Sequence, residues 1–159
     1  MSDAHTFVSR RRFCAGACHV ASGTTLATLL TACGGASSSP TAPSSPASAL
    51  GRLAGRFTGA GVQATIAGSA LADVGGAVLV ESNAGVFLLA RTSASTFSAI
   101  EAVCTHEGCT ITGAAGDIYV CPCHGSRYNR NGQVVNGPAK SSLRRYATTM
   151  TDGVVTIAL

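Results

Sequence analysis

Two short segments, Cys104-Thr105-His106-Glu107-Gly108-Cys109 and Cys121-Pro122-Cys123-His124-Gly125-Ser126-Arg127-Tyr128, decide how this sequence is interpreted. Each segment offers a cysteine and a histidine at short spacing, and each follows a predicted strand, so the two can direct thiolates and imidazoles to one point. A set of two cysteines and two histidines suits tetrahedral zinc as well as an iron–sulfur centre. The ligand count alone does not choose between these two sites.

The cysteine and histidine positions set these segments apart from the rest of the chain. The 159 residues include seven Cys and four His. Because seven cysteines cannot all pair in disulfides, at least one must have another role. Two Cys and two His fall in the first 32 residues, and Cys33 follows them. The other four Cys and two His all lie between residues 104 and 124.

The amino-acid composition excludes some classes of fold and of binding partner. Hydrophobic residues make up 46% of the chain and charged residues 11%, a balance that excludes simple disorder. The formal net charge of +4 comes with no basic patch of interleaved aromatics, so we expect no nucleic-acid partner.

From Leu50 onward, short apolar runs alternate with turn residues, and no window longer than ten residues sustains helical periodicity. The expected strands cover residues 76–80, 86–90, 97–103, 118–120, 133–135, 143–149 and 154–159. The first two form a hairpin through residues 81–85, and Asn131-Gly132 and Asp152-Gly153 are tight-turn signals. We predict an all-β domain over residues 51–159.

The N-terminal 33 residues are typical of an export signal. The basic stretch Ser9-Arg10-Arg11-Arg12-Phe13 precedes a mildly apolar run of small residues and resembles a twin-arginine signal. A transmembrane anchor is the main alternative, but Gly, Ser, Thr and His occupy much of the roughly 20-residue span that it needs.

Residues 30–34, Leu-Thr-Ala-Cys-Gly, resemble a lipobox, in which the signal is cut and Cys33 is lipidated. A signal without lipidation and an uncleaved anchor remain alternatives. Residues 34–50 are rich in Ser, Ala and Pro and are predicted to be a linker. The folded domain would then be exported, periplasmic or otherwise extracytoplasmic, and held at the membrane by a lipid.

The two cysteine–histidine segments resemble the Rieske iron–sulfur motif, Cys-x-His followed downstream by Cys-x-x-His. The likeness extends to Gly137-Pro138-Ala139, which is similar to the proline-containing third loop of the family, and it covers roughly residues 60–159. It implies stacked antiparallel sheets with a two-loop cluster-binding subdomain. It also implies one [2Fe–2S] cluster, with Cys104 and Cys121 on the inner iron and His106 and His124 on the outer iron.

The same resemblance implies roles for further residues of the two loops. Cys109 and Cys123 would form a disulfide between the loops, which requires an oxidising compartment. Ser126 and Tyr128 match positions whose hydroxyls donate hydrogen bonds to a bridging sulfide and a thiolate in high-potential members. Such bonds stabilise the electron-rich reduced state and raise the potential. Pro138 would lie beside the cluster.

The expected function is therefore that of a high-potential one-electron carrier, alone or as the small subunit of an oxidoreductase, and not catalytic by itself. Its partner would be a cytochrome, a copper protein or the large subunit of an oxidoreductase. One alternative is the Rieske subunit of a quinol-oxidising cytochrome bc complex, but Glu107 stands where such members usually carry Leu, and a carboxylate in an apolar socket is costly. A zinc-stabilised binding module without a redox role is the other alternative.

Overall fold

Strands dominate residues 46–159, the part of the chain that the computed structural model describes, with one 3₁₀ turn, η1 (Ala70–Ala72). The all-β prediction is confirmed. The predicted signal peptide, the lipobox with Cys33 and the predicted linker up to residue 45 lie outside the described residues. Within residues 46–159, no helix has the length and apolar character needed to cross a membrane.

The central sheet has the strand order β12-β7-β6-β5-β2. Its strands are β2 (Gly51–Ala54), β5 (Ala77–Ser82), β6 (Gly85–Arg91), β7 (Phe97–Glu101) and β12 (Arg145–Tyr146). The hairpin predicted from the sequence is present as β5 and β6, which pair antiparallel. The expectation of antiparallel sheets needs one correction, because β2 runs parallel to β5. The chain between these two strands is long enough for the crossover that parallel pairing requires.

Both faces of the central sheet are buried. Leu79, Leu88 and Ile100 lie opposite one another on β5, β6 and β7 and face one core. The neighbouring residues Val78 and Leu89 face a second core. Burial on both faces explains why these strands are continuous apolar runs instead of alternating ones.

The second sheet covers one face of the central sheet and has the order β13-β14-β4-β3. Its strands are β3 (Arg56–Phe57), β4 (Gly61–Thr65), β13 (Thr148–Thr151) and β14 (Val154–Ala158). Asp152 and Gly153 connect β13 to β14 with φ values of 49° and 74°. Positive φ at both turn positions is what a two-residue hairpin of this kind needs, so the predicted turn is confirmed.

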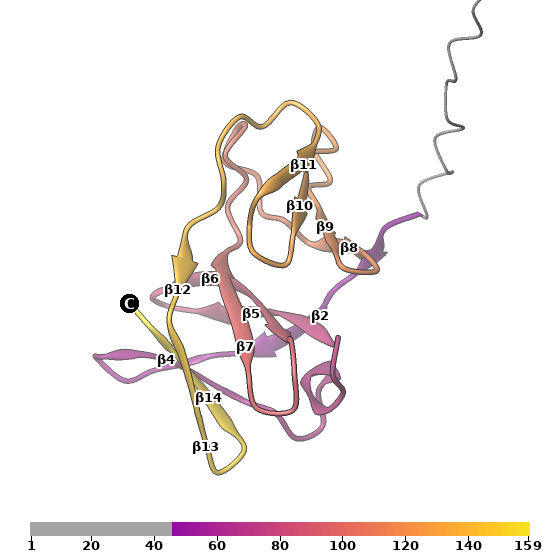
Figure 1. The fold of residues 1–159 in the computed structure, drawn as a ribbon. Coiled ribbons are helices and arrows are strands. Elements are labelled where there is room, and N and C mark those ends of the chain that lie inside the picture. The colour runs from indigo at the N-terminus through magenta and orange to yellow at the C-terminus, as the bar shows by residue number, and fades with distance from the viewer. Residues whose placement is uncertain (1–45) are drawn as a thin grey trace, which may run out of the picture. The chain divides into compact units, whose positions relative to one another are not determined.

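The third sheet, which we call the loop sheet, has the order β1-β8-β9-β10-β11 and lies at one end of the domain (Figure 1). Its strands are β1 (Ser48–Ala49), β8 (Gly113–Ala115), β9 (Ile118–Val120), β10 (Arg127–Asn129) and β11 (Val134–Asn136). Strand β1 falls within the residues predicted to be linker. The core between the loop sheet and the central sheet includes Cys104, Cys121 and Tyr128.

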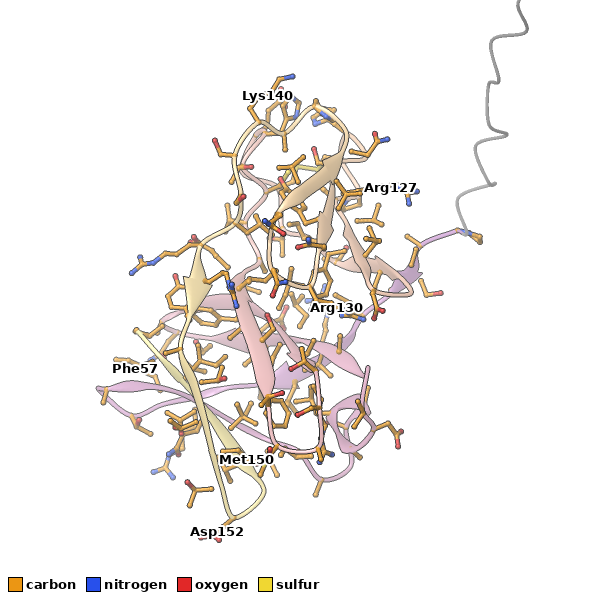
Figure 2. All side chains as sticks on the ribbon, in the orientation of Figure 1. Phe57, Arg127, Arg130, Lys140, Met150 and Asp152 are labelled. Atoms are coloured by element: carbon orange, nitrogen blue, oxygen red, sulfur yellow. A yellow bond between two sulfur atoms is a disulfide. The ribbon has the colours of Figure 1, made fainter. Side chains whose placement is uncertain are left out.

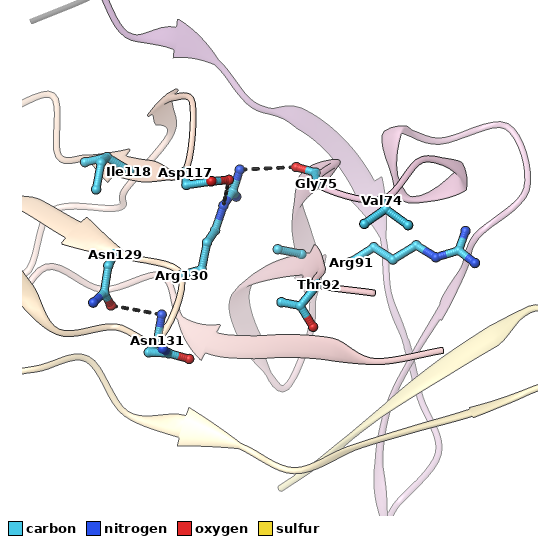
Figure 3. A pocket seen from close by; sticks show the side chains of 10 residues that line it. Val74, Gly75, Arg91, Thr92, Asp117, Ile118, Asn129, Arg130 and Asn131 are labelled. Atoms are coloured by element: carbon cyan, nitrogen blue, oxygen red, sulfur yellow. Dashed lines mark hydrogen bonds and ion pairs between the residues drawn. The ribbon is translucent and has the colours of Figure 1, made fainter. Parts of the chain in front are cut away.

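Arg130 joins the loop sheet to the central part of the domain (Figure 3). Its Nη2 atom donates to the carbonyl oxygens of Gly116 at 2.9 Å and Gly75 at 3.3 Å, and its Nε lies 3.5 Å from Asp117 Oδ1. The hydroxyl of Ser98 on β7 donates to the Arg130 carbonyl at 2.6 Å. A cavity of about 470 Å³ lies beside this connection. These contacts fix the loop sheet, and hence the two cysteine–histidine loops, against the central sheet.

Candidate metal centre

Loop 1 (residues 104–109) follows β7 and is closed by two backbone hydrogen bonds. The N–H of Cys104 donates to the carbonyl of Cys109 at 2.8 Å, and the N–H of Gly108 donates to the carbonyl of Cys104 at 2.9 Å. Gly108 has a φ of 75°, which favours glycine. The two bonds fix the backbone on both sides of His106.

Loop 2 (residues 121–126) connects β9 to β10 with the same pattern. The N–H of Cys121 donates to the carbonyl of Ser126 at 2.8 Å, and the N–H of Gly125 donates to the carbonyl of Cys121 at 3.1 Å. Gly125 has a φ of 72°. A glycine four residues after the first cysteine is therefore the sequence signal shared by both loops.

The four candidate donors meet where the loops converge. The free thiols of Cys104 and Cys121 are buried, with the residues 2% and 1% exposed. The rings of His106 and His124 lie edge to face with centroids 4.9 Å apart, and their side chains are 27% and 47% exposed. The structure thus brings all four predicted ligand residues into one place, with thiols inward and imidazoles outward.

His106 shows that this place suits a metal. Its Nδ1 atom is buried, and among the described residues it has no hydrogen-bond partner. A buried ring nitrogen without a partner carries a desolvation cost that a metal bond would remove. Two buried thiols and two imidazoles form the donor set that a mixed cysteine–histidine iron–sulfur centre requires.

The other two cysteines of the loops are joined to each other. Cys109 of loop 1 and Cys123 of loop 2 form a disulfide with a Cα–Cα distance of 6.5 Å, the pairing that the resemblance implies. The sulfur of Cys121 lies within 4.8 Å of both disulfide sulfurs. Because disulfide sulfurs are not thiolates, the free thiols in residues 46–159 are those of Cys104 and Cys121.

Tyr128 hydrogen-bonds the thiol of Cys104 from the neighbouring strand β10. Its hydroxyl oxygen lies 3.2 Å from Cys104 Sγ and 3.1 Å from Thr105 Oγ1, and it accepts the N–H of Thr105 at 3.2 Å. Thr105 Oγ1 donates to the carbonyl of Ser141 at 2.6 Å. With its own proton used there, the Thr105 oxygen can only accept from Tyr128. The tyrosine proton is thereby confined to two acceptors, Thr105 Oγ1 and the sulfur of Cys104.

Loop 3 (residues 137–142) packs directly on loop 2. A Cβ atom on Gly137 would lie 2.6 Å from the Cα of Ser126, so the backbones approach as closely as only glycine allows. The N–H of Ala139 donates to Ser126 Oγ at 3.2 Å, which leaves the buried serine hydroxyl proton free for another acceptor. Pro138, which lies between Gly137 and Ala139 in the sequence, is half-buried, and its role beside the cluster stays a prediction.

The titration behaviour of these groups reflects their surroundings. Burial acts to raise the pKa of the Cys104 thiol, but hydrogen bonds from Tyr128 and from the His106 backbone outweigh it, and this pKa lies below its ordinary value. Burial raises the pKa of Cys121, and burial with the Cys104 hydrogen bond raises the pKa of Tyr128. These hydrogen bonds therefore stabilise the thiolate form of Cys104 relative to an ordinary cysteine.

Two features of the site were not predicted from the sequence. The first is Thr105, which links Tyr128 to loop 3. Its position in the sequence between two predicted ligands was the available signal that it belongs to the site. The carboxylate of Glu107 was predicted only to oppose docking in an apolar socket, yet it lies beside the two imidazole rings.

A family model described as the Rieske [2Fe-2S] domain matches residues 66–147, slightly more than half of the chain. The chain belongs to the Rieske [2Fe-2S] family. The match contains both loops and loop 3, and membership implies one [2Fe–2S] cluster.

Several Rieske relatives are similar to this chain over the same region. The cytochrome b6-f complex iron-sulfur subunit of Chlorobaculum tepidum is 35% identical over 63 residues, covering 39% of this chain and 35% of the relative. The chloroplastic subunit of the same name from Oryza sativa subsp. japonica is 51% identical over 57 residues, covering 35% of this chain and 25% of the relative. The chain thus spans about a third or less of the length of these curated relatives.

A solved structure of a cyanobacterial plasma membrane Rieske protein, PetC3 from Synechocystis PCC 6803, is also similar. It is 28% identical, with a TM-score of 0.48, and the match covers 52% of this chain and 86% of that one.

Proposed function

We propose that this Rieske protein is a high-potential carrier of one electron at a time at the outer face of a bacterial membrane, alone or as the small subunit of an oxidoreductase. The observation that carries the proposal is the meeting of two buried free thiols with a half-buried and an exposed imidazole, those of His106 and His124, at the junction of loops 1 and 2. This arrangement separates a solvent-shielded side of the site from a side that a partner can reach.

The ligands in this proposal are Cys104 and Cys121 for the inner iron and His106 and His124 for the outer iron. The assignment is supported by the burial of the thiols and by the His106 Nδ1 atom, which has no hydrogen-bond partner within residues 46–159. Neutral imidazoles in place of two thiolates give such a cluster a potential of about −150 to +300 mV, against roughly −400 mV for plant-type ferredoxins. The exposed imidazole edges provide the route by which an electron reaches a partner.

Hydrogen bonds support a potential in the upper part of that range. The Tyr128 hydroxyl has the sulfur of Cys104 as one of its two acceptors, and Ser126 keeps a buried hydroxyl proton free beside loop 3. Donors aimed at the sulfurs stabilise the more negative, reduced state.

The location is inferred from the N-terminal sequence and from the disulfide. A disulfide between Cys109 and Cys123 persists in an oxidising compartment, which export through the twin-arginine route would supply. Lipidation of Cys33 would then hold the protein at the membrane. Replacing Cys33 with Ala should release the protein into the soluble fraction, and unchanged membrane retention would favour a helical anchor.

The partner in this proposal is a cytochrome, a copper protein or the large subunit of an oxidoreductase. The similarity to cytochrome b6-f iron-sulfur subunits favours a second candidate, the Rieske subunit of a quinol-oxidising complex. Glu107 argues against it, because its side chain is 60% exposed beside the imidazoles and would carry a charge into an apolar socket. Copurification of a cytochrome b with the native protein in mild detergent would support the second candidate.

The central test is spectroscopic. The full chain, purified anaerobically, should contain two iron and two acid-labile sulfide per chain and give the low-average-g electron paramagnetic resonance (EPR) signal of a Rieske centre when reduced by one electron. A colourless protein with one bound zinc would overturn the proposal and favour the zinc-stabilised module.

A further inference from the structure

Glu107 occupies the position in loop 1 directly after His106, and its carboxylate lies against both histidine rings. Its Oε1 is 3.9 Å from His106 Nε2, and its Oε2 is 3.6 Å from His124 Nδ1. One carboxylate therefore faces a ring nitrogen of each imidazole, on the exposed side of the site.

Within the described part of the chain, the Glu107 carboxylate pairs with no lysine or arginine. Among residues 46–159, no lysine or arginine lies within 4.0 Å of Glu107, and its ion-pair contacts are those to the two histidines. The negative charge beside the rings therefore has no ion-pair partner other than the two histidines among residues 46–159.

The buried Nδ1 of His106 has no hydrogen-bond partner among the residues that the structure describes, while its Nε2 faces Glu107. A metal-binding histidine commonly directs its other ring nitrogen to a carboxylate, which fixes the ring orientation and makes the imidazole a stronger electron donor. His106 therefore has one nitrogen available for a metal and the other turned toward a carboxylate.

We propose that Glu107 is a positioning residue that orients the His106 imidazole and, with its charge beside both rings, lowers the reduction potential of the centre. The inference rests on the proposed assignment of His106 and His124 as iron ligands. A negative charge next to the outer ligands stabilises the oxidised state, which has one electron less. Glu107 thus opposes the effect of the Tyr128 hydrogen bond and of the one proposed for Ser126, and the measured potential is the balance of the two effects.

The test compares the full-length protein with Glu107→Gln, which keeps the shape of the side chain and removes its charge, and with Glu107→Leu, which removes the charge and every polar atom of the side chain. Asp152→Asn is the matched control, because it also removes the charge of an exposed carboxylate. Asp152 lies in the β13–β14 turn, and Figure 2 shows this turn at the opposite end of the domain from Lys140 of loop 3. We expect both Glu107 variants to have a higher midpoint potential than the wild type, and Asp152→Asn to have an unchanged one.

Pulsed EPR of the reduced protein provides a second readout. The coupling of the remote nitrogen of His106 should differ between the wild type and each Glu107 variant, because the carboxylate lies beside that atom. Glu107→Asp keeps the charge but withdraws it from the rings, so its potential should lie between those of the wild type and Glu107→Gln. If Glu107→Gln and Glu107→Leu do not take up the cluster, Glu107→Asp alone is compared with the wild type. Nitrogen couplings that differ between these two proteins would then support the inference.

Variants that keep the Rieske signal with wild-type potential and wild-type nitrogen couplings would overturn this inference and leave the proposed function intact. A wild-type protein without a Rieske signal would instead overturn the ligand assignment and the proposed function.

Discussion

The hydroxyl oxygen of Tyr128 lies 3.2 Å from the sulfur of Cys104, although Tyr128 belongs to β10, Cys104 belongs to loop 1, and the two residues are 24 positions apart. Both residues are buried, so no water competes for this contact. Its strength depends on the charge of the sulfur, because hydrogen bonds to charged acceptors are stronger than those to neutral ones.

Tyr128→Phe keeps the ring and removes the donor. We expect the midpoint potential to fall by about 45 mV, because roughly 1 kcal/mol of hydrogen-bond energy corresponds to that shift in a one-electron couple. A redox titration that is monitored by circular dichroism measures this change in midpoint potential. Tyr146→Phe, at a half-buried ring that packs on Phe87 away from the loops, is the control. Equal potentials in wild type and Tyr128→Phe would show that the contact is not redox-active.

Ser126→Ala removes the other buried hydroxyl of the site. The potential should fall by a similar amount, and the N–H of Ala139 should lose its acceptor, which costs about 1 kcal/mol of stability. Redox titration and thermal unfolding separate the two effects. A drop in stability with no change in potential would assign Ser126 a structural role only.

The pair Cys109→Ala and Cys123→Ala, made together, removes the disulfide and leaves no odd thiol. The bond closes a loop with a sequence separation of 14, for which the chain-entropy model gives about 3 kcal/mol. We therefore expect a lower unfolding temperature and a faster loss of the cluster. The decay of visible absorbance measures the rate of that loss. Reduction of the wild type by a strong dithiol should reproduce the effect, and a double variant as stable as the wild type would contradict this account.

Gly137→Ala tests the packing of loop 3 on loop 2. Gly137 has a φ of 97°, and an added Cβ would meet the Cα of Ser126 at 2.6 Å. Gly59, with a φ of 83° and open space around it, provides the matched control. Gly59→Ala should cost about 1 to 2 kcal/mol from backbone strain alone, and Gly137→Ala should cost more and speed cluster loss. Equal losses of stability, measured by chemical denaturation, would show that the close approach is unimportant.

Much of the fold was predictable because it depends on local patterns. The hairpins at Asp152-Gly153 and between β5 and β6 follow from turn residues and short apolar runs, which act over a few positions. The parallel pairing of β2 with β5 was not predicted, since the two strands are separated by β3, β4 and η1. No local pattern specifies which distant strand a short segment will pair with.

The sequence by itself determined the donor set, because each loop carries a cysteine and a histidine within a single turn closed by its own backbone hydrogen bonds. Only the tertiary structure decided what surrounds those donors. The Thr105 contact with Ser141 spans 36 positions and the Arg130 contact with Gly75 spans 55. Likewise, Glu107 meets His124 only because loops 1 and 2 converge. Ligand identity is a local property of the chain, whereas the charges and hydrogen bonds that set a redox potential come from segments that folding brings together.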